Sequence, residues 1–380
     1  MGYSMYAPTG VTHVDKARVF PGFTLFATLS GDKLLLIDNA GEVVRSWDAP
    51  APFKPYYAFF LPESGNLLLR CTTGKETWGF GGASGAVVEM DWDGNVVWQY
   101  EHPTLHHDHC RLRNGNTLML GWEVLDPELA RRIQGGVPGS EMAPGVLDDD
   151  FCWVPDLAAA SGTERAAGSI VSDTLYEVDS KGEVVWTWHG SEHLDPDIDV
   201  ICPLEGRQEW THGNAVEEMP DGRILLSFRQ TSTILTLDKA TGNVLWRWGR
   251  GELSHQHDPT VMDDGNILIY DNGEHRTRGS CYSRVVEMDP VNEQIVWEYR
   301  GAPPLSFFST GISSAQRLPN GNTFVCEGRT GRLFEVTRAA EVVWEFVNPY
   351  EFPHRGDQRN RAIFRAAKYS ADGPELRGRV

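Results

Sequence analysis

The sequence of 380 residues contains no apolar run that approaches the roughly 18 residues needed to span a bilayer. It is also poor in positive charge, because 34 Lys and Arg residues stand against 53 Asp and Glu residues, giving a formal charge of −19. This charge should repel polyanions such as duplex nucleic acid. We therefore expect no nucleic-acid partner and no membrane partner.

Cysteine is scarce as well, and its spacing argues against two kinds of site. The six cysteines lie far apart and form no CxxC pair. Reduced thiols are therefore favoured over a disulfide framework or a zinc knuckle. The first twenty residues show no basic region followed by an apolar run, so they do not have the pattern of an export signal. We expect a cytoplasmic protein.

What the sequence does contain is one phrase repeated six times: a short apolar run, a turn, and then Val-Val-Trp or a close variant. Alternating β-branched residues around a Gly, Asn or Asp turn predict a β-hairpin at each copy, whose arms we name strands C and D. The copies occupy residues 33–47, 86–100, 174–188, 233–248, 284–299 and 332–346.

A second hairpin precedes five of these copies and supplies strands A and B. Its turns lie at Gly65, Gly115, Gly222, Gly265 and Gly321. Four antiparallel strands that recur about every 50 residues, with aromatics at fixed places, are typical of a propeller blade. The sequence therefore predicts an all-β, six-bladed β-propeller that forms a single domain over residues 1–380.

The two ends of the chain should share the sixth blade. The first C–D hairpin has only one strand before it, at 22–29, and residues 362–373 offer a spare strand A. Pairing of the two removes exposed edges. The predicted blades span 53–100, 105–188, 212–248, 257–299, 311–346, and 361–373 together with 20–47. Stacked sandwiches are disfavoured by the six copies, and a WD40 propeller by the lack of recurring Gly-His and Trp-Asp pairs.

The longest connection, residues 121–172, interrupts the second blade between strands B and C. A connection of this length in a compact domain is usually functional or disordered. It contains Phe151, Trp153 and a short helical run near residues 128–133, so we expect a lid rather than a disordered loop. The B-to-C and D-to-A connections share one face of a propeller, and the lid should lie on that face.

Polar side chains gather where strand A begins in successive blades. Counting back eight residues from each turn glycine, and from Gly373 at the end of the terminal strand, gives Tyr57, His107, Asn214, His257, Ser313 and Arg365. Close to these positions stand His109, His212 and Arg229. Imidazoles carry protons near neutrality, and a guanidinium stabilises negative charge on a transferring oxyanion. The pattern predicts a site in the channel. Hydrogen bonding between blades is the alternative role for each histidine.

Five of these residues, namely His212, Asn214, Arg229, His257 and Arg365, lie in motifs that resemble the bacterial arylsulfate sulfotransferase family. The motifs are THGNAVEEMPDGRILLSFRQTSTI, TGNVLWRWG, QHDPTVMDDGNILIYDNG and SRVVEMD, with NPYEF and FRAAKY near the end. The resemblance covers most of the chain and is strongest to the signal-less relatives. It implies a six-bladed propeller that passes a sulfuryl group from a phenolic sulfate donor to a phenolic acceptor through a sulfated histidine.

By this resemblance His257 is the nucleophile, and His107 is a sulfate binder or an acid/base group. The sulfuryl oxygens would be bound by His212, Asn214 and Arg229. The remaining candidates for substrate contact are His109, Tyr57, Ser313 and Arg365. We expect no cofactor, and the lack of a Gly-rich phosphate loop agrees with a donor that is not a nucleotide. The expected partner is a small aromatic substrate, and the oligomeric state stays open.

Two other functions remain open. A divalent metal ion bound by His107, His109, His212 and His257 would make the protein a lyase or an oxygenase. Arg229 opposes this reading, because a guanidinium beside a metal ion is repelled. A non-catalytic binding propeller is the third possibility, although a scaffold has no need of convergent histidines under a lid.

Overall fold

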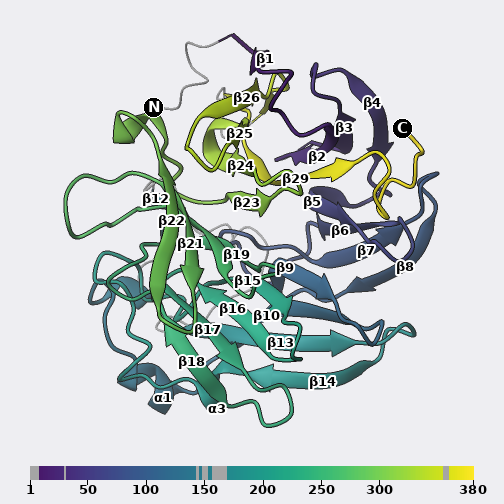
Figure 1. The fold of residues 1–380 in the computed structure, drawn as a ribbon. Coiled ribbons are helices and arrows are strands. Elements are labelled where there is room, and N and C mark those ends of the chain that lie inside the picture. Colours follow the sequence, from purple (N-terminus) through teal and green to yellow (C-terminus); the bar gives the residue numbers. More distant parts are fainter. Residues whose placement is uncertain (1–7, 30, 143–144, 148–152, 156–168, 354–358) are drawn as a thin grey trace.

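The computed structural model describes residues 8–29, 31–142, 145–147, 153–155, 169–353 and 359–380. Its main strands form six small antiparallel sheets arranged in a ring (Figure 1). The prediction of an all-β, six-bladed propeller is therefore confirmed. None of the described helices is long and apolar enough to cross a membrane.

Blades 1 to 4 follow one another along the chain, and the innermost strand comes first in each. Blade 1 consists of β5 (Lys54–Phe60), β6 (Leu67–Thr72), β7 (Ala86–Met90) and β8 (Val96–Glu101). Blade 2 consists of β9 (Leu105–Arg111), β10 (Thr117–Val124), β13 (Val171–Val178) and β14 (Val184–His189). Blade 3 consists of β15 (Gly213–Glu218), β16 (Ile224–Phe228), β17 (Thr233–Leu237) and β18 (Val244–Trp248). Blade 4 consists of β19 (His257–Val261), β20 (Ile267–Asp271), β21 (Arg284–Asp289) and β22 (Gln294–Arg300).

Blades 5 and 6 bring the two ends of the chain into the ring. Blade 5 consists of β23 (Ser314–Arg317), β24 (Thr323–Glu327), β25 (Arg332–Val336) and β26 (Val342–Val347), with β1 (Gly10–Val14) as a fifth strand at its outer edge. Blade 6 consists of β29 (Ile363–Ser370), β2 (Gly22–Thr28), β3 (Lys33–Ile37) and β4 (Val43–Asp48). In Figure 1 the yellow β29 lies beside the purple β2. The expected closure is present, whereas the strand β1 was not predicted.

The smaller elements lie in the connections. They are α1 (Pro127–Arg132), η2 (Ser140–Met142), α3 (Gly190–His193), η3 (Pro304–Ser306), η4 (Gly328–Thr330), and the two-stranded pairs β11 (Gly145–Leu147) with β12 (Trp153–Pro155) and β27 (Phe352–Pro353) with β28 (Arg359–Asn360). The helix α1 falls on the predicted helical run, and its N-terminus is capped by the side chain of Asp126. Phe151 and the side chain of Trp153 lie outside the described residues, so the lid stays a prediction.

Tryptophans at two strand-D positions, which lie two residues apart in the repeat, connect neighbouring blades. Trp188 in β14 donates its Nε1 hydrogen to the carbonyl oxygen of Gly242, in the β17–β18 turn of blade 3, at 2.9 Å. Trp47, Trp297 and Trp344 donate in the same way to the C–D turn of the blade that follows each of them. These four tryptophans therefore pack between blades. Each hydrogen bond to a turn carbonyl satisfies the polar N–H group of the indole ring while the ring contacts the next blade.

Lys368 of β29 and Glu335 of β25 form a fully buried ion pair between blades 6 and 5. Both side chains are inaccessible to solvent, and Nζ lies 2.8 Å from Oε2. Removing one partner of such a pair leaves an uncompensated buried charge, which costs about 3–5 kcal/mol. The pair therefore contributes to holding the closing strand in place only while it is complete.

We predict that Lys368→Met lowers the free energy of unfolding by about 3–5 kcal/mol, measured by urea denaturation. The matched control is Lys33→Met, which breaks the solvent-exposed pair that Lys33 makes with Asp48. That change should cost at most about 1 kcal/mol. Equal losses in the two variants would show that burial of the Lys368 pair does not matter to closure.

Candidate active site

His257 begins β19, and its ring is held by a side chain from the end of strand B in the same blade. Asn272 Oδ1 lies 2.8 Å from His257 Nδ1. The amide orientation is set by the Nδ2 group of Asn272, which donates to the carbonyl oxygen of Ser309 at 2.9 Å. An amide oxygen accepts only, so His257 carries its proton on Nδ1. The lone pair of the neutral ring is consequently on Nε2.

His107 lies next to His212, and their rings meet edge to face with centroids 4.5 Å apart. The Nδ1 atom of His107 lies 2.9 Å from Nδ1 of His106. The Nε2 atom of His106 in turn lies 3.0 Å from Asp173 Oδ1. A carboxylate at that distance favours a proton on Nε2 of His106, which leaves Nδ1 of His106 to accept from His107. His107 then presents the lone pair of its Nε2.

Burial lowers the pKa of His107 well below its ordinary value, and positive charge on His212, His106 and His257 would lower it further. His107 is therefore neutral near pH 7, as a proton acceptor has to be. Because the charge of His257 affects the pKa of His107, the two rings lie within electrostatic reach of each other. The structure thus brings together three of the predicted histidines, His107, His212 and His257.

The backbone at His107 and His212 is held in the left-handed region, with φ of 48° and 51°. This conformation is unfavourable for residues other than glycine and tends to persist where the surroundings hold a side chain in a particular place. Gly82 packs against the ring of His107 so closely that any Cβ at that position would overlap it. His212 Nδ1 lies 2.9 Å from Glu209 Oε2, which favours positive charge on His212.

The strand registers correct the predicted alignment in two blades. The A–B turn of blade 2 closes with a bond from Leu112 N to Asn116 O, whereas that of blade 1 runs from Leu61 N to Asn66 O and has one more residue. Counting back from the turn glycine therefore selected Tyr57, although Tyr56 is the residue equivalent to His107.

The same error occurs in blade 6, where no tight turn joins β29 to β2. Lys368 pairs with Thr24, and Thr24 pairs with Ile37, so that Phe364 is equivalent to His107 and Arg365 lies one residue further. Tyr57 and Arg365 therefore align with Asp108 of blade 2 and Asp258 of blade 4. The counting was one residue off for both.

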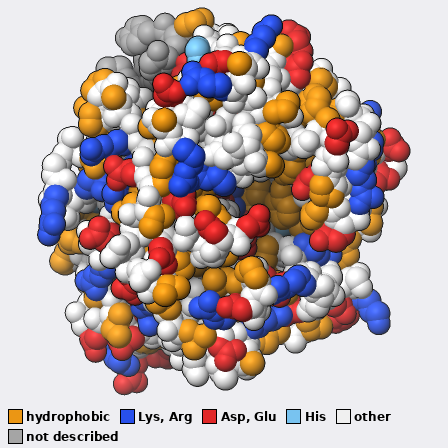
Figure 2. Space-filling model, in the orientation of Figure 1, with side chains coloured by type: hydrophobic (Ala, Val, Ile, Leu, Met, Phe, Trp, Pro, Cys, Tyr) orange, Lys and Arg blue, Asp and Glu red, His pale blue; other side chains and the backbone are white. Residues whose placement is uncertain are grey.

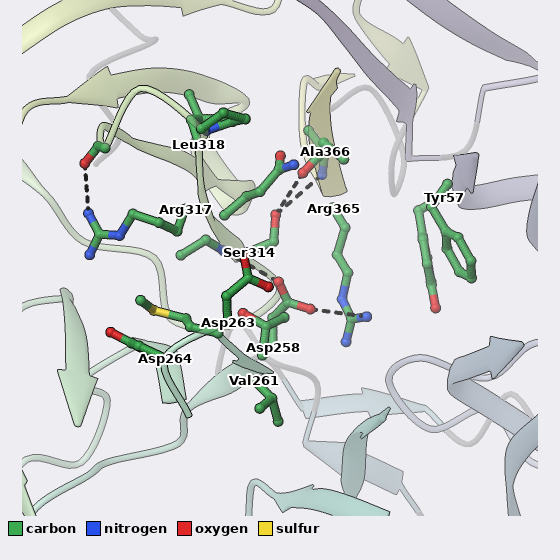
Figure 3. A pocket seen from close by; sticks show the side chains of 18 of the residues that line it. Tyr57, Asp258, Val261, Asp263, Asp264, Ser314, Arg317, Leu318, Arg365 and Ala366 are labelled. Atoms are coloured by element: carbon green, nitrogen blue, oxygen red, sulfur yellow. Dashed lines mark hydrogen bonds and ion pairs between the residues drawn. The ribbon is translucent and has the colours of Figure 1, made fainter. Parts of the chain in front are cut away.

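These four residues meet across the channel, and we name Tyr57, Asp108, Asp258 and Arg365 the crossbar. Arg365 lies 2.9 Å from Asp108 Oδ1 and 3.2 Å from Asp258 Oδ1, through its Nη1. Tyr57 donates its hydroxyl hydrogen to Asp108, and the guanidinium lies over the tyrosine ring. In Figure 3 Arg365 extends between Asp258 and Tyr57. The crossbar joins blades 6, 2, 4 and 1.

The crossbar borders a cavity of about 690 Å³ on the side of the A–B turns. Its wall includes the turn residues Asp263, Asp264, Leu318 and Pro319 (Figure 3). Figure 2 shows a hollow with hydrophobic side chains near the middle of the face drawn in Figure 1, with acidic and basic side chains interspersed around it. The cavity is thus on the opposite side of the crossbar from the connections that carry His212 and Asn272.

Three predicted residues occupy supporting positions. His109 contacts the tyrosine hydroxyl of Tyr57 through Nδ1 at 3.2 Å and stacks on Phe59, so it belongs with the crossbar. Ser313 Oγ accepts from the Asn272 amide at 3.3 Å. Asn214 donates from Nδ2 to the carbonyl oxygen of Gln256, across the boundary of blades 3 and 4, at 2.8 Å.

Arg229 follows β16 directly and is buried between two carboxylates. Its Nη1 lies 2.8 Å from Glu205 Oε1, and its Nη2 lies 2.6 Å from Glu274 Oε2. The triad carries one surplus negative charge. An anion bound by this guanidinium has to compete with both carboxylates, which the motif alone did not indicate.

The four histidines of the metal hypothesis do not share one site among the residues that the structure describes. Groups of three or more ligand atoms within 4.8 Å of one another include neither His107 nor His109, His212 or His257. The Nδ1 atoms of His109 and His257 are already directed at Tyr57 and Asn272, respectively.

Asn272 is the contact of His257 that the sequence reasoning missed. Strands β16 and β20 pair in the same register with the strands that follow them, so Asn272 occupies in blade 4 the place that Arg229 occupies in blade 3. The signal was therefore present in the repeat. It required comparing the residues that follow strand B, as well as those that begin strand A.

Comparison with known protein families establishes the family of this chain. The protein-family model described as "Arylsulfotransferase (ASST)" matches residues 146–349, which is more than half of the chain. The chain belongs to the arylsulfotransferase family. The match includes His212, Asn214, Arg229 and His257, and His107 precedes it. No curated protein matches this arylsulfotransferase-family chain.

Solved structures support the fold of this arylsulfotransferase-family protein. A protein of unknown function from Bacteroides caccae is similar with a TM-score of 0.53 and 13% identity, over 92% of this chain and 99% of its own. A streptogramin B lyase has a TM-score of 0.49 and 11% identity, over 90% of this chain and 84% of its own. At such identities the first likeness establishes the fold alone, and the second carries no argument about chemistry.

Glu217 of β15 lies near the crossbar and gives the arylsulfotransferase-family chain a pH dependence that can be measured. Burial raises the pKa of Glu217 to about 7, and the charges of Asp258 and Asp108 act in the same direction. Between the ordinary carboxyl pKa and about 7, the folded state binds more protons than the unfolded state. Stability therefore falls as pH rises through this window.

We predict that Glu217→Gln removes this loss. Between pH 5 and pH 8 the free energy of unfolding of the wild type should fall by about 3 kcal/mol relative to that of the variant. This value follows from the raised pKa of Glu217, because each unit of pKa shift corresponds to about 1.36 kcal/mol. Urea unfolding at four pH values across this range measures the difference. Parallel stability curves would mean that Glu217 ionises normally in the folded protein.

Proposed function

We propose that the protein moves a sulfuryl group from a phenolic sulfate donor to a phenolic acceptor through a sulfated His257. Family membership supports the reaction class. The observation that carries the choice of nucleophile is the contact from His257 Nδ1 to Asn272 Oδ1, with Asn272 itself anchored on Ser309. It keeps the proton on Nδ1 and the attacking lone pair on Nε2.

In the first half-reaction the Nε2 lone pair of His257 attacks sulfur, and the bond from sulfur to the aryl oxygen breaks. The phenolate leaves with that electron pair. His257 keeps its Nδ1 proton, so the sulfated ring is cationic and remains a good leaving group. Asn272 stabilises this proton throughout, because its oxygen accepts the hydrogen bond in the free and in the sulfated state.

In the second half-reaction the acceptor oxygen attacks sulfur, and the nitrogen–sulfur bond breaks, which returns the electron pair to His257 Nε2. The acceptor proton goes to His107, whose neutral state and Nε2 lone pair suit a base. His106 and Asp173 then stabilise the imidazolium through the chain of nitrogen and oxygen contacts behind it. His107 can return this proton to the next leaving phenolate.

We assign His212 and Asn214 to the sulfuryl oxygens. Glu209 favours positive charge on His212, and the Asn214 amide has a second hydrogen besides the one given to Gln256. We also assign Arg229 to the sulfuryl oxygens, which have to compete for its guanidinium with Glu205 and Glu274. The proposal places the reaction on the connection-bearing side of the crossbar, and a cytoplasmic location, a small aromatic substrate and independence from cofactors remain part of it.

We predict that the wild type releases 4-nitrophenol from 4-nitrophenyl sulfate when phenol is present, and that His257→Ala is slower by about 10³-fold or more. The matched control is His13→Ala, which removes an exposed histidine of β1 and should keep full activity. Label from a ³⁵S donor should appear on the peptide that contains His257 in an alkaline quench. Wild-type rates in His257→Ala, or label on another residue, would contradict the assignment.

A second prediction concerns Asn272 as a positioning residue. Asn272→Ala should lower kcat by about 10²-fold with little change in KM, because the tautomer of His257 is no longer fixed. Asn272→Asp should recover part of kcat and move the acid limb of the pH profile of kcat/KM upward. The sign follows because a carboxylate stabilises protonated His257, so the nucleophile is released only at higher pH. An unshifted profile in Asn272→Asp would rule out direct coupling of the two side chains.

A further inference from the structure

A second cluster of ligating side chains lies beside Arg229 and takes no part in the proposed reaction. Its members are Cys202 between α3 and β15, His255 between β18 and β19, and His275 between β20 and β21. One ligand atom from each lies within 4.8 Å of the other two. Thiolate and imidazole are the ligands that zinc and similar transition metals prefer in proteins.

The spacing of the ligand atoms fits a tetrahedral ion. Cys202 Sγ lies 3.6 Å from His275 Nδ1. Metal–sulfur and metal–nitrogen bonds of about 2.3 and 2.0–2.1 Å, at a tetrahedral angle, place the two ligand atoms about 3.5–3.6 Å apart. The rings of His255 and His275 meet edge to face, with centroids 4.6 Å apart, so neither blocks the other. The side chains therefore need little movement to bind.

His255 supplies the second, independent observation. Its side chain is fully buried, and its Nε2 has no hydrogen-bond partner among the residues that the structure describes. Its Nδ1 lies 3.1 Å from Glu205 Oε1. A histidine that binds a metal commonly directs its other ring nitrogen at a carboxylate, which orients the ring and raises its basicity.

The local charge also favours a cation. Arg229 is paired with both Glu205 and Glu274, which leaves one surplus negative charge next to His255. Ionisation of Cys202 on metal binding adds a second. A divalent ion balances the two, and the charge of Arg229, which acts on all three ligands, is offset by its two carboxylate partners.

An entry path exists on the outer side. Cys202 and His275 line a cavity of about 430 Å³, which also contacts Thr231, Ser232 and Arg276. We propose that Cys202, His255 and His275 bind one divalent transition-metal ion of the zinc class, with a fourth position open toward this cavity. The site is distinct from the channel histidines and does not rest on the proposed sulfuryl transfer.

The test uses full-length protein depleted of metal and titrated with Co²⁺. We expect one Co²⁺ per chain, a thiolate-to-Co²⁺ charge-transfer band in the near ultraviolet, and displacement by Zn²⁺. Cys202→Ser should abolish the band, and His275→Ala should weaken Co²⁺ binding by about tenfold or more. The matched controls are Cys281→Ser, another partly exposed free thiol, and His257→Ala, and both should keep the band.

Circular dichroism of the metal-free variants checks that each is folded. A measurement on the wild type alone is independent of that check: Zn²⁺ should protect Cys202, and not Cys281, from alkylation by iodoacetamide. The proposal is overturned if the wild type gives no band, if the band survives Cys202→Ser, or if Zn²⁺ leaves Cys202 reactive. Loss of the band in His257→Ala with retention in His275→Ala would move the metal to the channel and overturn it as well.

Discussion

The pairing of β29 with β2 is the constraint on which the rest of the molecule depends. Six residue pairs join the last long strand of the chain to one of its first, and they complete the sixth sheet. Without them the ring has two open blades, and the innermost strands lose their fixed spacing around the channel. Arg365 lies on β29, so the same pairing that closes the ring also delivers the cation that joins Asp108 to Asp258.

The fold was readable from the sequence because a propeller repeats. Six copies of one hairpin and five of another predict the blades almost to the residue, and the spare strands at the two ends predict the closure. The strand β1 was missed because a single short strand at an outer edge has no partner hairpin and leaves no repeat. The alignment of Tyr57 and Arg365 was displaced by one residue for a different reason. The A–B turn of blade 1 is one residue longer than that of blade 2, and no turn joins strands A and B of blade 6.

The sequence predicted the histidines of the candidate site but not most of the residues that hold their rings in place. Histidines at or close to equivalent strand starts pointed to His107, His212 and His257, since a repeat converts sequence spacing into spatial proximity. What holds these rings comes from elsewhere, namely Asn272, Glu209 and Asp173. Glu209 lies in a connection, whose geometry a repeat does not predict, and Asp173 lies in β13 at a blade position that has no counterpart motif. Asn272 could have been found from the repeat, but only by comparing the residues that follow strand B. The carboxylates around Arg229 were likewise invisible, because Glu205 and Glu274 reach it from two different connections.

The crossbar has a consequence for anyone who looks for ligands of this protein. The cavity of about 690 Å³ is bounded by Arg365, Asp258 and Tyr57, and its other walls are residues of the innermost strands and the A–B turns of blades 4 and 5. A compound chosen to fill that volume would be held apart from His257 by the crossbar, whose ion-paired and hydrogen-bonded side chains come from four blades. Under the proposed function, screening by the size of this cavity would select molecules for the side of the crossbar away from His257, and a competitive inhibitor would have to bind from the face that carries the long connections.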